Sequence, residues 1–262
     1  MPRFDAEYIP RSAMTVFAHP DDAEFLVAGT IARWTRAGCD VTSVVMTSGN
    51  VGTHDATCTR KDLARTRESE QEAAARVLGI GNVVFLGYDD CELLPTLELR
   101  RRLVREIRKY TPEVVICGDP QAWFFEDRYI NHPDHRAAAT AALDAVFPCS
   151  EMELLWPEEG PAHKVRAVYV CATHSPNTWI DVTGTIDAKI EALAAYGSQL
   201  GDRDPSDMIR EWASRDASIA AAHGMPIAGG TGKSNPGPRY AEAFRVMRIR
   251  QREDSDPQGD MI

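Results

Sequence analysis

Short apolar runs alternate with amphipathic segments along the first 150 residues of the chain. Four runs are rich in aliphatic and β-branched residues and have the length of buried strands, at 14–18, 41–46, 83–86 and 114–117. The segments between and after them space their apolar residues three or four apart, which predicts helices at 24–37, 61–78, 97–110 and 135–147. This alternation predicts right-handed βαβ units, and therefore an α/β, Rossmann-like fold in which a mostly parallel sheet is flanked by helices.

The second half of the chain is less regular, and we expect it to form a C-terminal extension of strands and helices. After an inserted loop at 149–163, the pattern predicts strands at 165–171, 178–182 and 244–249 and helices at 185–196 and 206–222. A Gly- and Pro-rich stretch at 224–238 is either a flexible loop or a segment that closes over the site. We therefore expect one domain at 1–250, with core βα units at 14–147 and a C-terminal part at 165–250, followed by a disordered polar tail at 251–262.

The composition narrows the classes of function and of cellular location. The chain has 262 residues, of which 44% are hydrophobic and 26% charged, as is ordinary for a globular protein. Its 29 basic and 39 acidic residues leave a net charge of −10, which disfavours binding to nucleic acid or to anionic lipid. The six cysteines are far apart without a CxxC pair, which indicates reduced thiols in a cytoplasmic protein. The N-terminus does not resemble a signal peptide, and we expect no membrane span.

Two short motifs concentrate histidine and aspartate in predicted loops. HPDD at 19–22 follows the first strand directly, and HPDH at 132–135 is expected directly after the fourth. In parallel sheets, ligands bind at the carboxyl ends of the strands, so both loops should meet at one edge. A catalytic zinc site needs three nitrogen or oxygen ligands and an open position for water. Together the motifs can supply two imidazoles and one carboxylate, with a second carboxylate left over as a base.

A structural interpretation of the same residues is also open. Asp22 and Asp134 stand just before predicted helices, where aspartate is a preferred N-cap. His19 could be a hydrogen-bonded histidine at the end of a strand. A single HPDD motif would therefore indicate little. The coincidence of two such clusters on loops that are predicted to meet favours a functional site.

These motifs, with their neighbours, resemble the LmbE-like, or PIG-L, family of zinc-dependent N-acetyl deacetylases, which act on N-acetylglucosamine-containing substrates. The resemblance extends over residues 14–250 and includes MTVFAHPDDAEFLVAGTIARWTRAG, MTSGNVGTHD, RTRESEQEAAARVLGI, NHPDHRAAA and NTWIDVTGTIDAKIEALAAYGSQ. The segment GYDDCELLP is most similar to the diacetylchitobiose deacetylase branch. The resemblance implies a hydrolase that removes an N-acetyl group from such a sugar or glycoconjugate, and a homo-oligomer, either a trimer or a hexamer.

The resemblance also implies how the metal and the base are placed. His19, Asp22 and His135 would bind the ion, which would be zinc, although the same ligand types also suit Fe²⁺ or Mn²⁺. Asp21 adjoins a ligand without binding the metal itself, and would take a proton from the attacking water.

The remaining implied residues contact the reacting group or the substrate. His132 would stabilise the oxyanion or protonate the leaving nitrogen, with Asp134 orienting it and raising its pKa. Arg67 would contact the substrate or support the site. Asn50 occupies a position where the family often has an acidic residue, and we expect it to contact the substrate. Trp123 belongs to an aromatic run that could stack on a sugar face or pack in an oligomer contact.

Two other functions fit the same residues. The first is a zinc amidase that cleaves a sugar–thiol conjugate or a longer acyl group. The second is a protein that binds a metal or ligand without hydrolysing it, in which case Asp21 would be dispensable.

Overall fold

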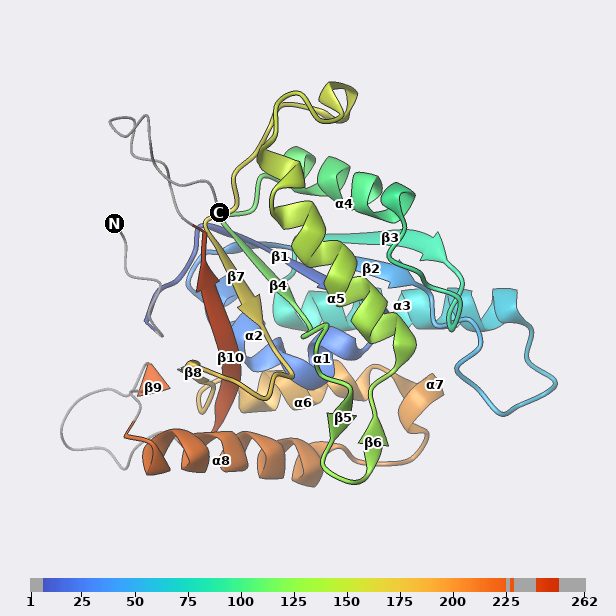
Figure 1. The fold of residues 1–262 in the computed structure, drawn as a ribbon. Helices are drawn as coiled ribbons and strands as arrows, with labels where there is room; N and C mark the ends of the chain where they lie inside the picture. Colours follow the sequence, from blue (N-terminus) through green and yellow to red (C-terminus); the bar gives the residue numbers. More distant parts are fainter. Residues whose placement is uncertain (1–6, 225–226, 229–238, 250–262) are drawn as a thin grey trace.

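An eight-stranded sheet forms the centre of the molecule, and its strands do not follow the order of the sequence (Figure 1). The structure is a computed structural model that describes residues 7–224, 227–228 and 239–249. From one edge to the other, the strands are β3 (Asn82–Tyr88), β2 (Asp40–Thr47), β1 (Ser12–Phe17), β4 (Val114–Cys117), β7 (Ala167–Val170), β10 (Ala241–Arg248), β8 (Thr178–Asp181) and β9 (Ile227–Ala228). The five strands from β3 to β7 are parallel, whereas β10 is antiparallel to both neighbours. The predicted mostly parallel α/β sheet is therefore confirmed.

Helices cover both faces of the sheet (Figure 1). One face packs against α4 (Leu97–Tyr110) and α5 (Pro133–Val146). The other packs against α1 (Asp22–Leu26), α2 (Ala28–Arg36), α3 (Arg60–Leu78), α6 (Ile186–Ala194) and α8 (Ser206–Ala222), while α7 (Gly197–Leu200) is a single turn between α6 and α8. The sheet is thus covered on both faces, and β1, β2 and β4 are buried along nearly their whole length.

Local capping signals explain where two of the predicted helices begin and end. The side chains of Thr59 and Thr96 each accept a hydrogen bond from the backbone N–H three residues on, at the starts of α3 and α4. Gly79 ends α3 in the left-handed conformation, at φ 72°. These helices therefore match the predicted segments to within a residue.

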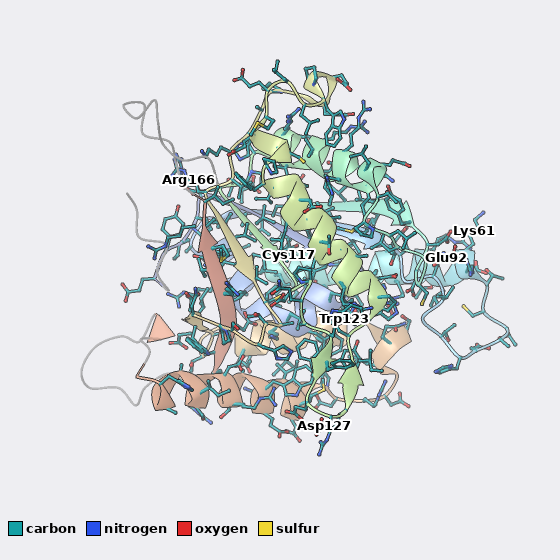
Figure 2. All side chains as sticks on the ribbon, in the orientation of Figure 1. Lys61, Glu92, Cys117, Trp123, Asp127 and Arg166 are labelled. Carbon is teal, nitrogen blue, oxygen red and sulfur yellow. The ribbon has the colours of Figure 1, made fainter. Side chains whose placement is uncertain are left out.

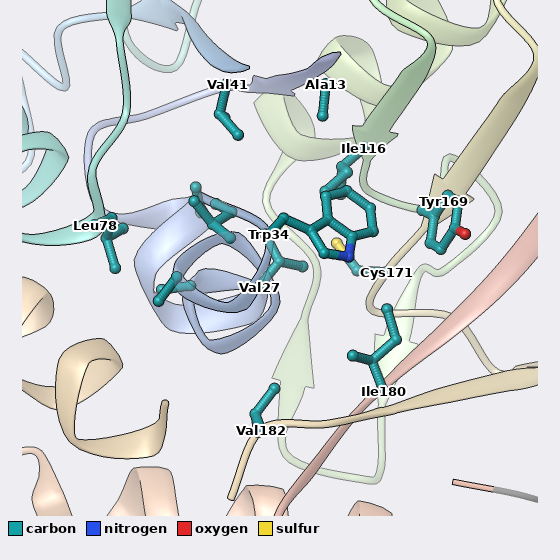
Figure 3. Close-up of a cluster of buried hydrophobic side chains, with 14 of the residues drawn as sticks. Ala13, Val27, Trp34, Val41, Leu78, Ile116, Tyr169, Cys171, Ile180 and Val182 are labelled. Carbon is teal, nitrogen blue, oxygen red and sulfur yellow. The ribbon is translucent and has the colours of Figure 1, made fainter. Parts of the chain in front are cut away.

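A buried tryptophan holds the segment that carries the HPDD motif against the sheet. Trp34 on α2 is 1% exposed, and its ring meets that of Tyr169 on β7 edge to face, with 5.3 Å between centroids. Figure 3 shows Ile116 and Ile180 packed around the same indole. This contact fixes α2, and with it the short α1 and the loop that leads into it from β1.

The structure differs from the sequence predictions at two points that shape the site. The predicted helix at 24–37 is divided into α1 and α2, because Val27 between them leaves the helical region at φ −137° and ψ 8°. The HPDH motif does not follow the fourth strand directly. A hairpin of β5 (Phe124–Phe125) and β6 (Tyr129–Ile130) lies between β4 and α5, and its two-residue strands are too short to produce a periodic signal.

Several expectations concern the rest of the chain. The inserted loop contains two 3₁₀ helices, η1 (Cys149–Glu151) and η2 (Pro157–Glu159), which the buried Arg108 of α4 holds through hydrogen bonds to backbone carbonyls. Most of the Gly- and Pro-rich stretch and all of the polar tail lie outside the described residues. The division into one domain at 1–250 stays a prediction.

Among the described residues, no helix combines the length and apolar character needed to cross a bilayer.

A carboxylate from the other end of the chain caps α2. Glu242 on β10 accepts hydrogen bonds from the backbone N–H groups of Gly29 (3.0 Å) and Thr30 (2.8 Å), in the first turn of the helix. Lys189 of α6 lies 2.6 Å from the same carboxylate, and both side chains are about 95% buried. The ion pair thus joins α2, α6 and β10 and neutralises a charge that would otherwise be buried alone.

We expect Glu242→Gln to lower the free energy of unfolding by about 3–5 kcal/mol, because the Lys189 ammonium would remain buried without its counter-charge. Chemical denaturation of the two proteins measures the difference. Glu191→Gln, at an exposed position on α6, provides the control and should change stability by less than about 0.5 kcal/mol. Equal stability of wild type and Glu242→Gln would contradict this account of the α2 cap.

Candidate active site

Two histidines and an aspartate from the predicted motifs converge at the carboxyl edge of the sheet. His19 lies at the end of β1, Asp22 begins α1, and His135 lies in the first turn of α5. His135 Nε2 is 3.2 Å from His19 Nδ1 and 3.1 Å from Asp22 Oδ1, while His19 Nδ1 is 3.6 Å from Asp22 Oδ2. The strand order thus brings together side chains that are 116 residues apart in sequence.

The local backbone explains how each loop presents its side chains. Asp21, at φ 93°, occupies the N-cap position of α1 in a left-handed conformation, and Asp22 is the first helical residue. In the second loop, His132 is the N-cap of α5 and Pro133 takes the first helical position, where proline is favoured. The interpretation of Asp22 and Asp134 as N-caps is therefore wrong, because both lie inside their helices.

Hydrogen bonds set the tautomers of both histidines. Asn131 donates through Nδ2 to the carbonyl of Ala122 at 2.7 Å, so its Oδ1 is the atom that faces His135 Nδ1 at 3.0 Å. An amide oxygen only accepts, which places the proton of His135 on Nδ1 and leaves the Nε2 lone pair free. His19 Nε2 faces two carboxylates, Asp90 Oδ1 at 3.0 Å and Asp134 Oδ2 at 3.3 Å, which places its proton on Nε2.

His19 Nδ1, His135 Nε2 and the Asp22 carboxylate, which turns Oδ2 toward His19 and Oδ1 toward His135, lie within 3.1–3.6 Å of one another, and this arrangement fits a divalent metal ion. Two imidazole lone pairs 3.2 Å apart repel each other unless a cation or proton lies between them. Tetrahedral bonds of about 2.0–2.1 Å place ligand atoms about 3.3 Å apart, close to the separations observed. His132 also lies near this position, within a group of three histidines whose ligand atoms are within 4.8 Å of one another. Its Nδ1, however, accepts the Asp134 N–H at 3.3 Å.

The electrostatics of the cluster favour a bound cation. Burial alone would lower the pKa of His19, but Asp22, Asp134 and Asp90 outweigh it and raise the pKa to about 12. Burial likewise opposes ionisation of Asp22, yet His135 and His19 hold its pKa well below the usual range. The surrounding carboxylates therefore create a negative potential that favours a second proton on His19, at Nδ1, when no metal is bound, and a bound metal ion would take the place of that proton.

Asp21 and Arg67 form a buried ion pair beside the cluster. Arg67 of α3, 4% exposed, donates to Asp21 Oδ2 (3.1 Å), the carbonyl of Pro20 (2.7 Å) and the carbonyl of Gly49 (3.2 Å). Burial raises the pKa of Asp21 to about 7, while Arg67 acts in the opposite direction. A carboxylate with a pKa near neutrality is suited to accept and return a proton. Arg67 thus supports the site, and its predicted contact with substrate stays a prediction.

Gly49 leaves the space that the Arg67 guanidinium occupies. A Cβ at this residue would lie 2.0 Å from Arg67 Nη1, and the backbone is in the left-handed region at φ 59°. We expect Gly49→Ala to displace the guanidinium from Asp21 and to lower kcat/KM by about 100-fold, as misplacements of about 1 Å can do. Steady-state kinetics and metal content measure the effect, and metal content should not change. Gly38→Ala, also at positive φ but with open space around it, is the control.

The carboxylate of Asp134 does not make the contact that was expected of it. Asp134 Oδ2 accepts from the backbone N–H of Cys91 at 2.7 Å and faces His19, while only the backbone N–H of Asp134 contacts His132. The pKa of His132 is lowered, because burial and the nearby His19 outweigh the opposing effect of Asp134. Asp134 thus acts on the pKa of His132 in the expected direction, but its effect is smaller than the effects that lower this pKa.

The loop after β3 contributes residues that the motif analysis missed. Asp90, 4% exposed, faces His19, and its backbone N–H donates to Asn50 Oδ1 at 3.0 Å. Asn50 also donates to Asp89 at 2.5 Å, so it joins the loops after β2 and β3. The available signal was the pair of aspartates in the loop after the predicted strand at 83–86, at the edge where the other loops meet.

Trp123 lies on the segment between β4 and α5, where its carbonyl accepts the backbone N–H of Asn131 at 2.8 Å. It is 54% exposed, and the guanidinium of Arg136 stacks on its ring at 3.8 Å from the centroid. Figure 2 shows it beside the hairpin, on the chain that leads from β4 to α5. The indole is thus accessible to a ligand or a protein partner, and its predicted contact with substrate stays a prediction.

Comparisons with known proteins bear on the fold and the family of this chain. The chain is 31% identical over 241 residues to diacetylchitobiose deacetylase from Thermococcus kodakarensis, covering 90% of this chain and 83% of the relative. The solved structure of N,N'-diacetylchitobiose deacetylase from Pyrococcus horikoshii superposes with a TM-score of 0.79 at 28% identity, covering 94% of this chain and 88% of that one. The structure of GalB, a 4-carboxy-2-hydroxymuconate hydratase from Pseudomonas putida, gives a TM-score of 0.74 at 24% identity over 93% of this chain and 99% of that one, which shows a shared fold alone. The family described as "PIG-L: GlcNAc-PI de-N-acetylase" matches residues 14–146, and the chain therefore belongs to the PIG-L family.

Proposed function

We propose that this protein is a metal-dependent hydrolase that removes the acetyl group from the nitrogen of an N-acetylglucosamine-type sugar or glycoconjugate. The observation that supports this most directly is the convergence of His19, Asp22 and His135 beside the buried carboxylate of Asp21. Two of the relatives named above are diacetylchitobiose deacetylases, and the chain spans most of their length.

His19 Nδ1, His135 Nε2 and the Asp22 carboxylate would hold the ion. Their nitrogen and oxygen donors suit zinc, and they also suit Fe²⁺ or Mn²⁺. When bound, such an ion lowers the pKa of a coordinated water and polarises the acyl carbonyl. The hydrogen bonds from Asn131 and Asp90 would keep both imidazoles oriented toward it.

Asp21 would act as the general base. It is not one of the three converging ligands, its pKa is raised to about 7, and Arg67 holds its carboxylate in place. The proton that it takes from the attacking water would then be available for the leaving amine.

His132 would stabilise the oxyanion or protonate the leaving nitrogen. Its Nδ1 accepts the backbone N–H of Asp134, so a neutral His132 carries its proton on Nε2, where it can be donated. Arg67, Asn50 and Trp123 remain the proposed substrate contacts. Trp123 could stack on a sugar face or pack in an oligomer contact. Either role needs an exposed side chain, and Trp123 is exposed.

Release of acetate from a panel of N-acetylglucosamine derivatives, assayed with and without a chelator, tests the proposed function. We expect at least one derivative to be hydrolysed, chelation to abolish turnover, and added Zn²⁺, Fe²⁺ or Mn²⁺ to restore it. Turnover that survives complete removal of metal would contradict the proposed mechanism. Metal binding without hydrolysis of any derivative would instead favour a non-catalytic binding protein.

Two further proposals concern the setting in which the protein works. We expect a homo-oligomer, a trimer or hexamer, and a monomeric mass by light scattering would contradict this. We also place the protein in the cytoplasm, where its six free cysteines would stay reduced.

A further inference from the structure

A small cavity lies directly against the candidate metal ligands. Its volume is about 30 Å³, and Asp22 and His135 form part of its wall. The rest of the lining comes from the end of β1, from α1, from the segments after β4 and β7, and from the start of α5. It is mostly apolar, and its other polar residues are Asp119 and Asn131. The apolar residues that matter here are Leu26, Gly118, Ala138, Ala139 and Ala172.

The cavity has a polar side, formed by Asp22 and His135, and a mostly apolar side, and these two sides suit the carbonyl and the alkyl end of an acyl group. A carbonyl oxygen needs a cation or hydrogen-bond donors, which would lie on the side of His135 and Asp22. An alkyl group needs an apolar surface from which water is excluded, which the alanines of α5 and Leu26 supply. On α5 the lining is built from the smallest apolar side chains, so the space between these residues is left open.

The size of the cavity limits what it can hold. A cavity of about 10–15 Å³ is enough for one water molecule, so about 30 Å³ has room for one or two heavy atoms. The methyl group of an acetyl fits within this volume. A propyl group, as in butyryl, has three carbons and would have to displace the wall, which is densely packed.

We propose that this cavity receives the methyl group of the acyl substrate, and that Leu26, Gly118 and Ala139 make the enzyme selective for acetyl over longer acyl groups. This inference rests on the proposed deacetylase function and deepens it, since it assigns the acyl specificity to named residues. The inference also distinguishes the two candidate functions, since an amidase for longer acyl groups would need a larger cavity at this place.

Substitutions that change the volume of the cavity test the proposal with N-acetyl-, N-propionyl- and N-butyrylglucosamine as substrates of the metal-loaded protein. The chain of butyryl exceeds the cavity by at least one methylene, so the wild-type kcat/KM for butyryl should be about 10–200-fold below that for acetyl, with propionyl between the two. Leu26→Ala enlarges the cavity and should raise the ratio of butyryl to acetyl turnover by at least about tenfold. A Cβ at Gly118 would lie 3.9 Å from Ala139 Cβ, an ordinary contact, so Gly118→Ala narrows the cavity without a clash and should lower acetyl turnover.

Ala139→Val fills the cavity further, and Ala142→Val is its control. Ala142 is buried on the same helix but does not line the cavity, so its substitution reports the effect of added volume in α5 alone. Thermal denaturation shows whether each variant folds. Wild-type rates that are equal for the three acyl groups would overturn the proposal, and so would an unchanged butyryl-to-acetyl ratio in Leu26→Ala.

Binding of the free carboxylates provides a measurement that does not depend on turnover. In isothermal titrations of the metal-loaded protein, acetate should bind more tightly than butyrate to the wild type, and Leu26→Ala should reduce or reverse this order. If the carboxylates follow this order but no N-acyl sugar is hydrolysed, the cavity assignment holds and the proposed function fails. If sugars are hydrolysed but chain length has no effect on rates or on carboxylate binding, the cavity assignment fails alone.

Discussion

Replacement of His135 by alanine is expected to abolish metal binding and, with it, all metal-dependent turnover. His135 Nε2 is the only one of the three converging donors that comes from the second loop, and it lies 3.2 Å from His19 Nδ1 and 3.1 Å from Asp22 Oδ1. Loss of a hydrogen-bond partner outside the ligand set typically lowers metal affinity by about 10–100-fold. Loss of a ligand should exceed this range. Metal content of the purified protein, measured by mass spectrometry, and rates with added metal give the result.

Two matched variants make this experiment specific. Asn131→Ala removes the hydrogen bond to His135 Nδ1 and should weaken metal affinity by about 10–100-fold without abolishing it. His223→Ala changes an exposed histidine at the end of α8 and should leave metal content unchanged. Full retention of metal by His135→Ala would refute the ligand assignment, whereas loss in all three variants would indicate a general effect on folding.

Asp21→Asn is expected to keep the metal and to lower kcat by about 10²–10⁴-fold, the usual contribution of a general base. Asparagine has the size of aspartate and tolerates the left-handed backbone at φ 93°. It cannot accept the proton from water, although it can still accept a hydrogen bond from Arg67. A fall in kcat and in kcat/KM by the same factor would indicate loss of an interaction made in the transition state.

Stability must be measured alongside these rates, because Arg67 loses its buried counter-charge in Asp21→Asn. Thermal denaturation and metal content separate a loss of catalysis from a loss of structure. Asp144→Asn, at an ion pair between α5 and Arg100, is the control for removing a carboxylate elsewhere and should keep wild-type rates. Unchanged turnover in Asp21→Asn would exclude it as the base.

Much of the fold could be predicted from the sequence, because its signals are local. The helix at 97–110 and the strand at 114–117 agree with the structure at both ends, where Thr96 supplies an N-cap and the strand is a short run of buried residues. The two His–Asp motifs follow from the same reasoning, since strand order in a parallel sheet brings such loops to one edge. In both cases the information lies within a few residues of the feature that it determines.

Other features depend on residues that are distant in the sequence. The position of β10 between β7 and β8 follows from backbone pairing, and the cap that Glu242 provides to α2 joins residues 213 apart. The contact of Asp90 with His19 spans 71 residues and marks Asp90 as part of the site. None of these contacts leaves a periodic or motif signal, because each depends on where a separate element packs.

The sequence by itself therefore determined the α/β class, the helices with clear caps, and the two loops that carry the candidate ligands. Only the tertiary structure decided which ring nitrogen of His19 and of His135 faces the candidate metal site. It also decided which carboxylates surround that site and how small the adjoining cavity is. The physical reason is that periodicity and capping act over one or two turns of chain. Tautomers, pKa values and cavity volumes instead depend on groups brought together by packing of the whole sheet.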